Sequence, residues 1–254
     1  MNDGNALTYN DAFFTRVTEP GIESARVIVP RVLQLVRAQS VIDIGCGLGA
    51  WLKVFQENGV KNIRGLDGDY VDQSRLLIDA NRFNSVDLAQ PININVDERY
   101  DLATCLEVAE HLPASAAPHL VRALTRLSPF VLFSAAIPNQ GGRGHINEQW
   151  PSYWKELFAV NGFQRLDPIR RHVLRDKRVR WCYRQNIFLF GTPEAIARSE
   201  MLREEERLAE LDIVCLDLIN RHNTLKDVLA DVPRLVKHAV ERRMHHPWLL
   251  RARR

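Results

Sequence analysis

The chain has 254 residues, 46% hydrophobic and 26% charged, which suits one folded domain with a buried core and an appended segment. The formal net charge of +3 is too small to demand a nucleic-acid partner, and no run of about 18 apolar residues could cross a membrane. Four scattered cysteines without a Cys-x-x-Cys spacing argue against a disulfide framework or a structural zinc site. Because the N-terminus lacks the basic and apolar regions of a signal peptide, we expect a cytoplasmic protein.

The first 40 residues precede the first strand-like segment. Apolar residues recur at helical spacing from Ile22 to Val36, which predicts an amphipathic helix interrupted at Pro30. We therefore predict that residues 1–40 form an N-terminal helical cap. Such a helix either covers a bound ligand or closes the edge of a sheet.

The stretch from Val41 to Gly49 is the one around which the chain is organised. Four residues with strand character lead into three glycines at alternate positions, and apolar residues at helical spacing follow from Ala50. This pattern predicts a buried strand, a tight glycine turn and a helix, the opening unit of a doubly wound α/β domain. Glycines suit the turn because it needs positive φ angles and bare backbone near a ligand. An ordinary strand-to-helix turn would show the same glycines, so the loop alone does not establish a binding site.

Three further strand-like segments follow, each with an acidic residue at its C-terminal end. In an open α/β sheet the C-terminal ends of parallel strands meet at one edge, and ligands bind there. We therefore predict that these acids lie at the same edge as the glycine loop. The three acids are Asp67, Asp87 and Glu107.

The remainder of this domain continues the alternation of helices and strands, so residues 41–191 are predicted to form an α/β domain with a Rossmann-like doubly wound sheet of seven strands. The last two strands are predicted to be an antiparallel pair. The predicted segments are a helix over Ala114–Leu127, a strand over Phe130–Ala135, a loop over Pro138–Gly144, a helix over Ser152–Val160, and closing strands within Phe163–Leu174 and Val179–Phe190.

A new unit begins at Thr192, which can cap a helix that starts with Pro193. Residues 192–254 are predicted to form a C-terminal helical extension with a basic tail. The tail suits an acidic partner or the anionic inner face of a membrane, and the helix could also support a homodimer. A solvated tail is the alternative interpretation. The apolar seam of the helix runs through Met201, Leu208, Leu211, Cys215 and Leu218.

The run from Asp43 to Gly49 resembles motif I of the class I S-adenosylmethionine-dependent methyltransferases. This resemblance implies that S-adenosylmethionine is the cofactor. It also implies that Asp67 meets the ribose hydroxyls and that Asp87 meets the adenine amino group. The implied cofactor-binding set is Asp43, Gly45, Cys46, Gly47, Gly49, Asp67, Gly68, Asp87, Leu88 and Leu106.

A cluster of carboxylates and imidazoles follows the fourth strand. If this segment is helical, Glu107, Glu110 and His111 share one face, and two facing carboxylates are costly without a cation. His145, after the fifth strand, would lie on the same rim of the sheet. The four residues are therefore candidate ligands of a divalent metal, and their oxygen and nitrogen donors suit Mg²⁺ or Mn²⁺.

The same residues have other possible roles if no metal binds. His111 or His145 would then accept the proton of a hydroxyl nucleophile, and Glu110 would act with His111 as acid or base. A third interpretation gives Glu110 and His111 a purely structural role at a helix end.

The Glu-x-x-Glu-His motif of residues 107–111 is similar to that of the ubiquinone-biosynthesis O-methyltransferases and of the small-RNA 3′-terminal 2′-O-methyltransferases. In the latter, two Glu and two His hold a metal that grips a vicinal diol. The segment from His145 to Trp150 partly matches the context of the second His in that family, but the spacing to the tryptophan differs. Residues 10–190 as a whole most resemble methyltransferases that accompany glycan or natural-product biosynthesis. The resemblance implies an O-methyltransferase that acts on a hydroxyl of a sugar, glycan or related small molecule.

Two alternative functions follow from the same residues. RNA 3′-end methylation would require a concentrated basic surface, and the sequence shows only Arg170–Arg171 and Arg175–Arg180. A non-catalytic cofactor-binding scaffold subunit would keep the glycine loop and Asp67 but would not need the Glu-x-x-Glu-His motif. We therefore expect a small-molecule or glycan acceptor and no nucleic-acid partner.

Overall fold

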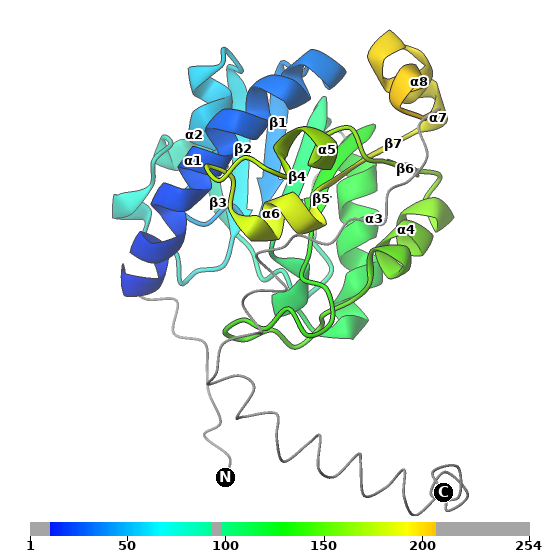
Figure 1. Ribbon diagram of the computed structural model, residues 1–254. Helices are drawn as coiled ribbons and strands as arrows, with labels where there is room; N and C mark the ends of the chain where they lie inside the picture. Colours follow the sequence, from blue (N-terminus) through cyan, green and yellow to red (C-terminus); the bar gives the residue numbers. More distant parts are fainter. Residues whose placement is uncertain (1–10, 93–97, 207–254) are drawn as a thin grey trace, which may run out of the picture. The chain divides into compact units, whose positions relative to one another are not determined.

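The computed structural model describes residues 11–92 and 98–206. Within them, a seven-stranded sheet in the order β3-β2-β1-β4-β5-β7-β6 has helices on both faces (Figure 1). Strands β1 to β5 run parallel, whereas β7 is antiparallel to both β5 and β6. The predicted Rossmann-like, doubly wound sheet of seven strands is confirmed. The strands are β1 Ser40–Ile44, β2 Asn62–Asp67, β3 Phe83–Ser85, β4 Leu102–Leu106, β5 Phe130–Ser134, β6 Gln164–Leu166 and β7 Phe188–Gly191.

The central strands are buried on both faces. In β1, Val41 belongs to the core on the side of α1 and α2, whereas Ile42 and Ile44 belong to the core on the side of α3 and α4. Successive residues of a strand point to opposite faces, so a strand covered on both sides is apolar throughout. This arrangement leaves the polar residues at the C-terminal strand ends, where open α/β sheets bind ligands.

The N-terminal helix α1 covers Asp11–Val36 and continues through Pro30. The predicted interruption at Pro30 is therefore wrong, and the helix starts earlier than predicted. A proline inside a helix costs about 3 kcal/mol. Ile28, Val29 and Val32 around it are fully buried, and burial of each such side chain contributes about 1.5–3 kcal/mol. Tertiary packing therefore outweighs the effect of the proline.

The helices expected after β1, over Ala114–Leu127 and over Ser152–Val160 are present as α2, α3 and α4, and α4 begins one residue earlier than predicted. No helix in the described part of the chain is long and apolar enough to span a membrane. The remaining helices and 3₁₀ turns are α2 Ala50–Glu57, η1 Gln73–Arg75, η2 Ala80–Arg82, η3 Ala109–His111, η4 Ala114–Ala116, α3 Ala117–Leu127, α4 Pro151–Val160, α5 Arg170–Val173, α6 Trp181–Asn186, α7 Pro193–Ala197 and α8 Glu200–Glu206.

The two closing strands are shorter than predicted. Helices α5 and α6 occupy much of the two segments that were expected to be extended. The apolar residues Ile169, Val173 and Val179 are buried in the core from these helices and the turn between them. Because a short apolar run fits a buried strand or a buried helix equally well, the sequence pattern could not distinguish the two.

The beginning of the C-terminal unit has the predicted cap. The amide of Ala195 donates to Oγ1 of Thr192 at 3.2 Å, and Pro193 is the first residue of α7. Residues 207–254, with the rest of the apolar seam and the basic tail, lie outside the described residues. The division of the chain into a cap, a cofactor-binding domain and a C-terminal extension stays a prediction.

Candidate active site

The loop after β1 brings bare backbone to the edge of the sheet. Gly45 and Gly49 have φ angles of 84° and 81°, which residues with side chains rarely adopt. A Cβ atom at Gly45 would lie 2.2 Å from Cγ2 of Val108, so the loop runs directly against the segment after β4. The amides of Gly45 and Cys46 donate to the Leu66 carbonyl at 2.7 and 3.1 Å. The predicted glycine turn is therefore present and is held between the ends of β2 and β4.

Asp67 lies buried at the C-terminal end of β2 and contacts the glycine loop. Its Oδ2 accepts a hydrogen bond from the Gly47 amide at 2.6 Å. Its Oδ1 accepts from the Gly68 amide at 2.7 Å and from the Tyr70 hydroxyl at 2.5 Å. Burial raises the pKa of Asp67, and these three hydrogen bonds oppose the rise. The structure thus brings Asp67, Gly47 and Gly68 together, and their binding of a cofactor stays a prediction.

The other predicted cofactor residues have different surroundings. Asp43 is buried within the sheet, where it accepts from Oγ1 of Thr104 at 2.6 Å, and burial raises its pKa to about 7. Asp87 is exposed in the loop after β3 and accepts from the amide of Ala89 at 2.9 Å. The remaining three, Cys46, Leu88 and Leu106, are buried.

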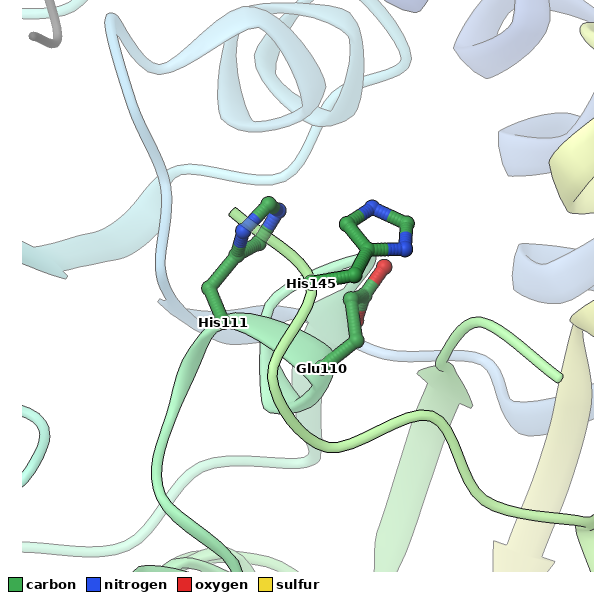
Figure 2. A group of neighbouring side chains, drawn as sticks. All are labelled: Glu110, His111 and His145. Carbon is green, nitrogen blue, oxygen red and sulfur yellow. The ribbon is translucent and has the colours of Figure 1, made fainter. Parts of the chain in front are cut away.

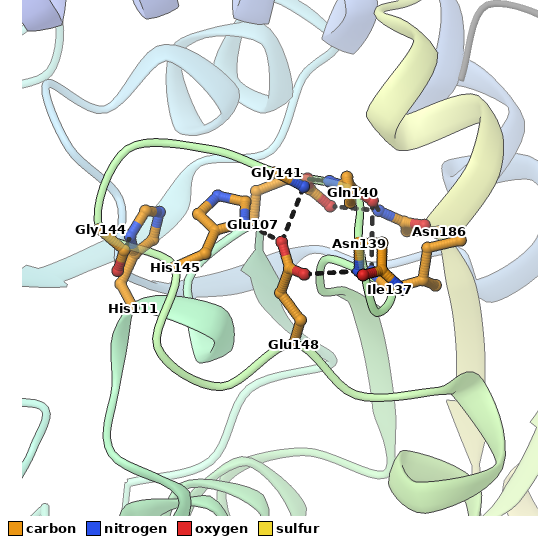
Figure 3. Close-up of polar contacts among 10 residues, drawn as sticks. All are labelled: Glu107, His111, Ile137, Asn139, Gln140, Gly141, Gly144, His145, Glu148 and Asn186. Atoms are coloured by element: carbon orange, nitrogen blue, oxygen red, sulfur yellow. Dashed lines mark hydrogen bonds and ion pairs between the residues drawn. The ribbon is translucent and has the colours of Figure 1, made fainter. Parts of the chain in front are cut away.

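Glu107 follows β4 with a φ angle of 56°, in the left-handed region. Its carboxylate accepts hydrogen bonds from Nε2 of Gln140 at 3.3 Å and from Nδ2 of Asn186 at 3.2 Å (Figure 3). Burial raises the pKa of Glu107, and these amide donors oppose the rise. The expectation that Glu107, Glu110 and His111 share one helical face is wrong, because the left-handed residue precedes a 3₁₀ turn, η3, that starts two positions later.

Glu110, His111 and His145 form a compact group. One possible ligand atom from each residue lies within 4.8 Å of the others. Figure 2 shows Glu110 and His111 on the turn after β4 and His145 on the loop after β5. The two imidazole rings meet edge to face, with centroids 4.9 Å apart. The structure therefore brings together three of the four predicted metal ligands and leaves Glu107 outside the group.

The Glu110 carboxylate is fully buried, and neither oxygen has a hydrogen-bond partner among the described residues. Burial raises the pKa of Glu110 well above its ordinary value and the nearby Glu107 raises it further, whereas the backbone amides of Glu110 and Ala136 oppose the rise. A buried carboxylate without a well-formed hydrogen bond is costly unless it is protonated or paired with a cation. A divalent ion would satisfy this group.

Both imidazoles are held through Nδ1. Nδ1 of His111 lies 3.3 Å from the Gly144 carbonyl, and Nδ1 of His145 lies 2.9 Å from Oε1 of Glu148. Because both partners are acceptors, Nδ1 of each ring donates to them, and Nε2 is the atom of each ring that a metal could use. Burial lowers the pKa of His111 to about 4, with a smaller contribution from His145, so His111 is neutral near pH 7. A carboxylate with two such imidazoles fits a divalent metal.

Glu148 organises the loop that carries His145. Its carboxylate accepts from the amides of Asn139 and Gly141 at 2.8 and 2.9 Å, in addition to its contact with His145 (Figure 3). A Cβ atom at Gly142 would lie 2.1 Å from Nε2 of His145. The His145 ring can therefore occupy this position against the loop only because residue 142 has no side chain.

Sequence patterns did not indicate Gln140, Asn186 or Glu148 as members of the site. Gln140 and Asn186 come from distant segments and meet at Glu107 only in the folded chain. Glu148 follows His145 by three residues, but its three contacts depend on how the loop folds back on itself. The signals in the sequence were the partial family match of the segment after His145, which contains Glu148, and the glycine-rich composition of the loop, which indicates backbone that approaches other groups closely.

Residues 21–174 match a family model that is described as a methyltransferase domain. The chain is also 24% identical over 163 residues to a ubiquinone biosynthesis O-methyltransferase of Hydrogenovibrio crunogenus. This match covers 60% of the chain and 61% of the relative, so the chain spans about three fifths of that protein.

Two solved structures have a similar fold. The amino pentose methyltransferase CalS10 of Micromonospora echinaspora, involved in calicheamicin biosynthesis and bound to S-adenosylmethionine, is 15% identical with a TM-score of 0.51; the match covers 75% of this chain and 99% of CalS10. An O-methyltransferase family protein from Burkholderia thailandensis is 14% identical with a TM-score of 0.51, covering 72% of this chain and 58% of that one. At these identities the similarity shows the fold alone.

Proposed function

Because the chain belongs to the methyltransferase domain family and is an S-adenosylmethionine-dependent methyltransferase, we propose that its acceptor is a hydroxyl of a sugar, glycan or related small molecule. We further propose that the enzyme uses a bound Mg²⁺ or Mn²⁺ ion. The observation that carries the proposal is the group of Glu110, His111 and His145 next to the turn after β4. It combines a buried carboxylate without a well-formed hydrogen bond with two imidazoles that are held through Nδ1, so Nε2 of each ring is the atom that could bind an ion. The curated O-methyltransferase relative supports oxygen as the acceptor atom.

These residues suit a divalent ion of the kind that oxygen and imidazole ligands bind. Glu110 would supply one oxygen, and His111 and His145 would each supply Nε2. Glu107 would have to leave Gln140 and Asn186 to become the fourth ligand. A bound ion would lower the pKa of a hydroxyl that it coordinates and would fix its orientation.

The reaction replaces the carbon–sulfur bond of the cofactor's methyl group with a carbon–oxygen bond, and the hydroxyl proton must leave. His111 is a poor acceptor for this proton because its pKa is about 4, which favours ligation over base catalysis for His111. His145, held by Glu148, is the proton acceptor that we propose for a reaction without metal. The buried Glu110 would then stay protonated beside it, since its pKa is raised.

The test is a methyl-transfer assay with labelled S-adenosylmethionine on saccharides, catechols and RNA 3′ ends, before and after exhaustive chelation. We expect transfer to saccharides that chelation reduces by about 100-fold or more and that added Mn²⁺ restores. Full activity after chelation would exclude the metal. Faster methylation of RNA ends than of any saccharide would replace the proposed substrate class. Cofactor binding without transfer to any acceptor would favour the scaffold function.

A further inference from the structure

Tyr70 occupies a hydrogen-bonding position on Asp67. Its hydroxyl donates to Oδ1 at 2.5 Å, which is in the range of a short, charge-assisted hydrogen bond to an ionised carboxylate. The Gly68 amide shares the same oxygen, and the Gly47 amide donates to the other one. All three donors come from this chain, and the Tyr70 hydroxyl is the only one of them on a side chain.

The ring of Tyr70 lies directly over Gly68. A Cβ atom at Gly68 would lie 2.1 Å from Cε1 of the ring, so the ring can adopt this position only because residue 68 is glycine. Tyr70 is nevertheless 44% exposed. It stands in the turn after β2, which is closed by a bond from the Val71 amide to the Gly68 carbonyl at 3.3 Å. Tyr70 is thus partly open to solvent next to the acid at the end of β2.

We propose that Tyr70 is a further cofactor-binding residue: its hydroxyl holds the place of a ribose hydroxyl on Asp67, and its ring packs against the adenosine once that hydroxyl is displaced. This inference rests on the proposed role of Asp67 at the ribose. A ribose hydroxyl and a tyrosine hydroxyl are the same kind of donor, so one can replace the other on Oδ1. Moving the tyrosine costs little burial, because the side chain is already partly exposed.

The two parts of the side chain should have opposite effects on affinity. While the hydroxyl is bonded to Asp67, only the fraction of molecules in which this bond is open can accept the ribose, and the apparent affinity is lowered by that fraction. The ring should increase affinity, because an aromatic face stacks on a nucleobase. Tyr70→Phe removes the first effect and keeps the second, whereas Tyr70→Ala removes both.

The experiment is calorimetric binding of S-adenosylhomocysteine and of 5′-methylthioadenosine to the full chain and its variants. We expect Tyr70→Phe to bind both ligands about threefold tighter than wild type, and Tyr70→Ala to bind them about fivefold or more weaker than Tyr70→Phe. The changes should be the same for both ligands, because both contain the adenosine and only the first contains the amino-acid half. Thermal unfolding of each variant checks the fold.

Three results would overturn the inference: Tyr70→Phe no tighter than wild type, Tyr70→Ala equal to Tyr70→Phe, or an effect confined to S-adenosylhomocysteine. Asp67→Asn in the same series separates this inference from the proposal beneath it. It should weaken both ligands about tenfold. If Asp67→Asn binds both ligands as tightly as wild type, the ribose lies elsewhere and the proposed role of Asp67 fails. If Asp67→Asn weakens binding but the Tyr70 variants bind like wild type, only the inference about Tyr70 is rejected.

Discussion

Asp43 and Glu110 are both buried carboxylates at the β1–β4 junction, and their hydrogen bonds distinguish them. Asp43 has a donor in Oγ1 of Thr104 at 2.6 Å, while neither oxygen of Glu110 has a donor among the described residues. A buried acceptor that is already satisfied stabilises the contact between two strands. An unsatisfied one requires a proton or a cation. On this physical ground we expect Asp43 to stabilise the pairing of β1 with β4 and Glu110 to take up a proton or a cation. The cofactor-binding role of Asp43 stays a prediction.

Asp43→Asn should flatten the pH dependence of stability between about pH 4 and pH 7. The pKa of Asp43 is about 7 in the folded chain against an ordinary 3.8, so in this window the folded state holds a proton that the unfolded state has lost. The free energy of unfolding therefore gains a contribution that falls as the pH rises, and asparagine abolishes it while keeping an acceptor for Thr104. Urea unfolding of both proteins across this window measures their free energies of unfolding. As the pH rises, the stability of the variant relative to the wild type should increase. A constant difference would contradict the prediction.

Glu110→Gln should weaken Mn²⁺ binding by roughly 100-fold or more, because an amide oxygen cannot replace a buried anionic ligand. Calorimetric titration with Mn²⁺ measures this effect, and circular dichroism checks the fold. Glu156→Gln, a change of the same chemistry at an exposed position of α4, is the matched control. Unchanged Mn²⁺ affinity in Glu110→Gln would remove this residue from the metal site.

At the scale of elements, the loop between β5 and α4 positions His145 through backbone contacts. Glu148 holds two loop amides and the His145 ring, and the amides of Ile146 and Asn147 donate to the Glu110 carbonyl at 2.8 and 3.1 Å. The loop is therefore attached directly to the turn that carries the other two residues of the group. This attachment explains how segments after two different strands form one compact site.

Gly142→Ala should weaken Mn²⁺ binding about tenfold or more, since its Cβ atom would lie 2.1 Å from Nε2 of His145 and must push the ring aside. Cofactor binding should stay unchanged. Gly141→Ala is the control in the same loop: its Cβ atom meets nothing within 4 Å, although its φ angle of 66° is strained for alanine. Titration of both variants with Mn²⁺ compares their affinities for the ion, and Gly142→Ala should lose more affinity than Gly141→Ala. Equal losses would indicate general disturbance of the loop instead of a blocked ligand position.

At the scale of the whole molecule, removal of residues 234–254 should spare cofactor binding. These residues include six arginines, one lysine and the run Trp248–Leu250, which suit an acidic partner or an anionic membrane. Each Lys or Arg near such a surface contributes about 1 kcal/mol, so binding should weaken with salt. Sedimentation and anionic-liposome binding of the full and shortened chains at low salt test this prediction. If the two chains behave alike, the tail is a solvated segment.

The features of this protein that depend on local spacing could be predicted from its residues. The glycine turn follows from the need for positive φ angles, and the acids at the strand ends follow from the rule that parallel strands end at one edge. The doubly wound sheet of seven strands could be predicted because alternating helices and strands leave few topologies. The same reasoning placed His111 and His145 on the same rim before their contact was visible.

The neighbours of each polar group, in contrast, became known only from the folded chain. Glu107 was expected beside Glu110 and His111, but its left-handed backbone sends the carboxylate to amides from two distant segments. Whether Glu110 has hydrogen-bond donors likewise depends on the segments that pack around its side chain in the fold. The short apolar runs around α5 and α6 form helices where strands were expected. The sequence could not show this, because a short apolar run fits a buried strand and a buried helix equally well. Contacts between segments far apart in the chain have no signature in spacing, and this is why the members of the site beyond its motif had to come from the fold.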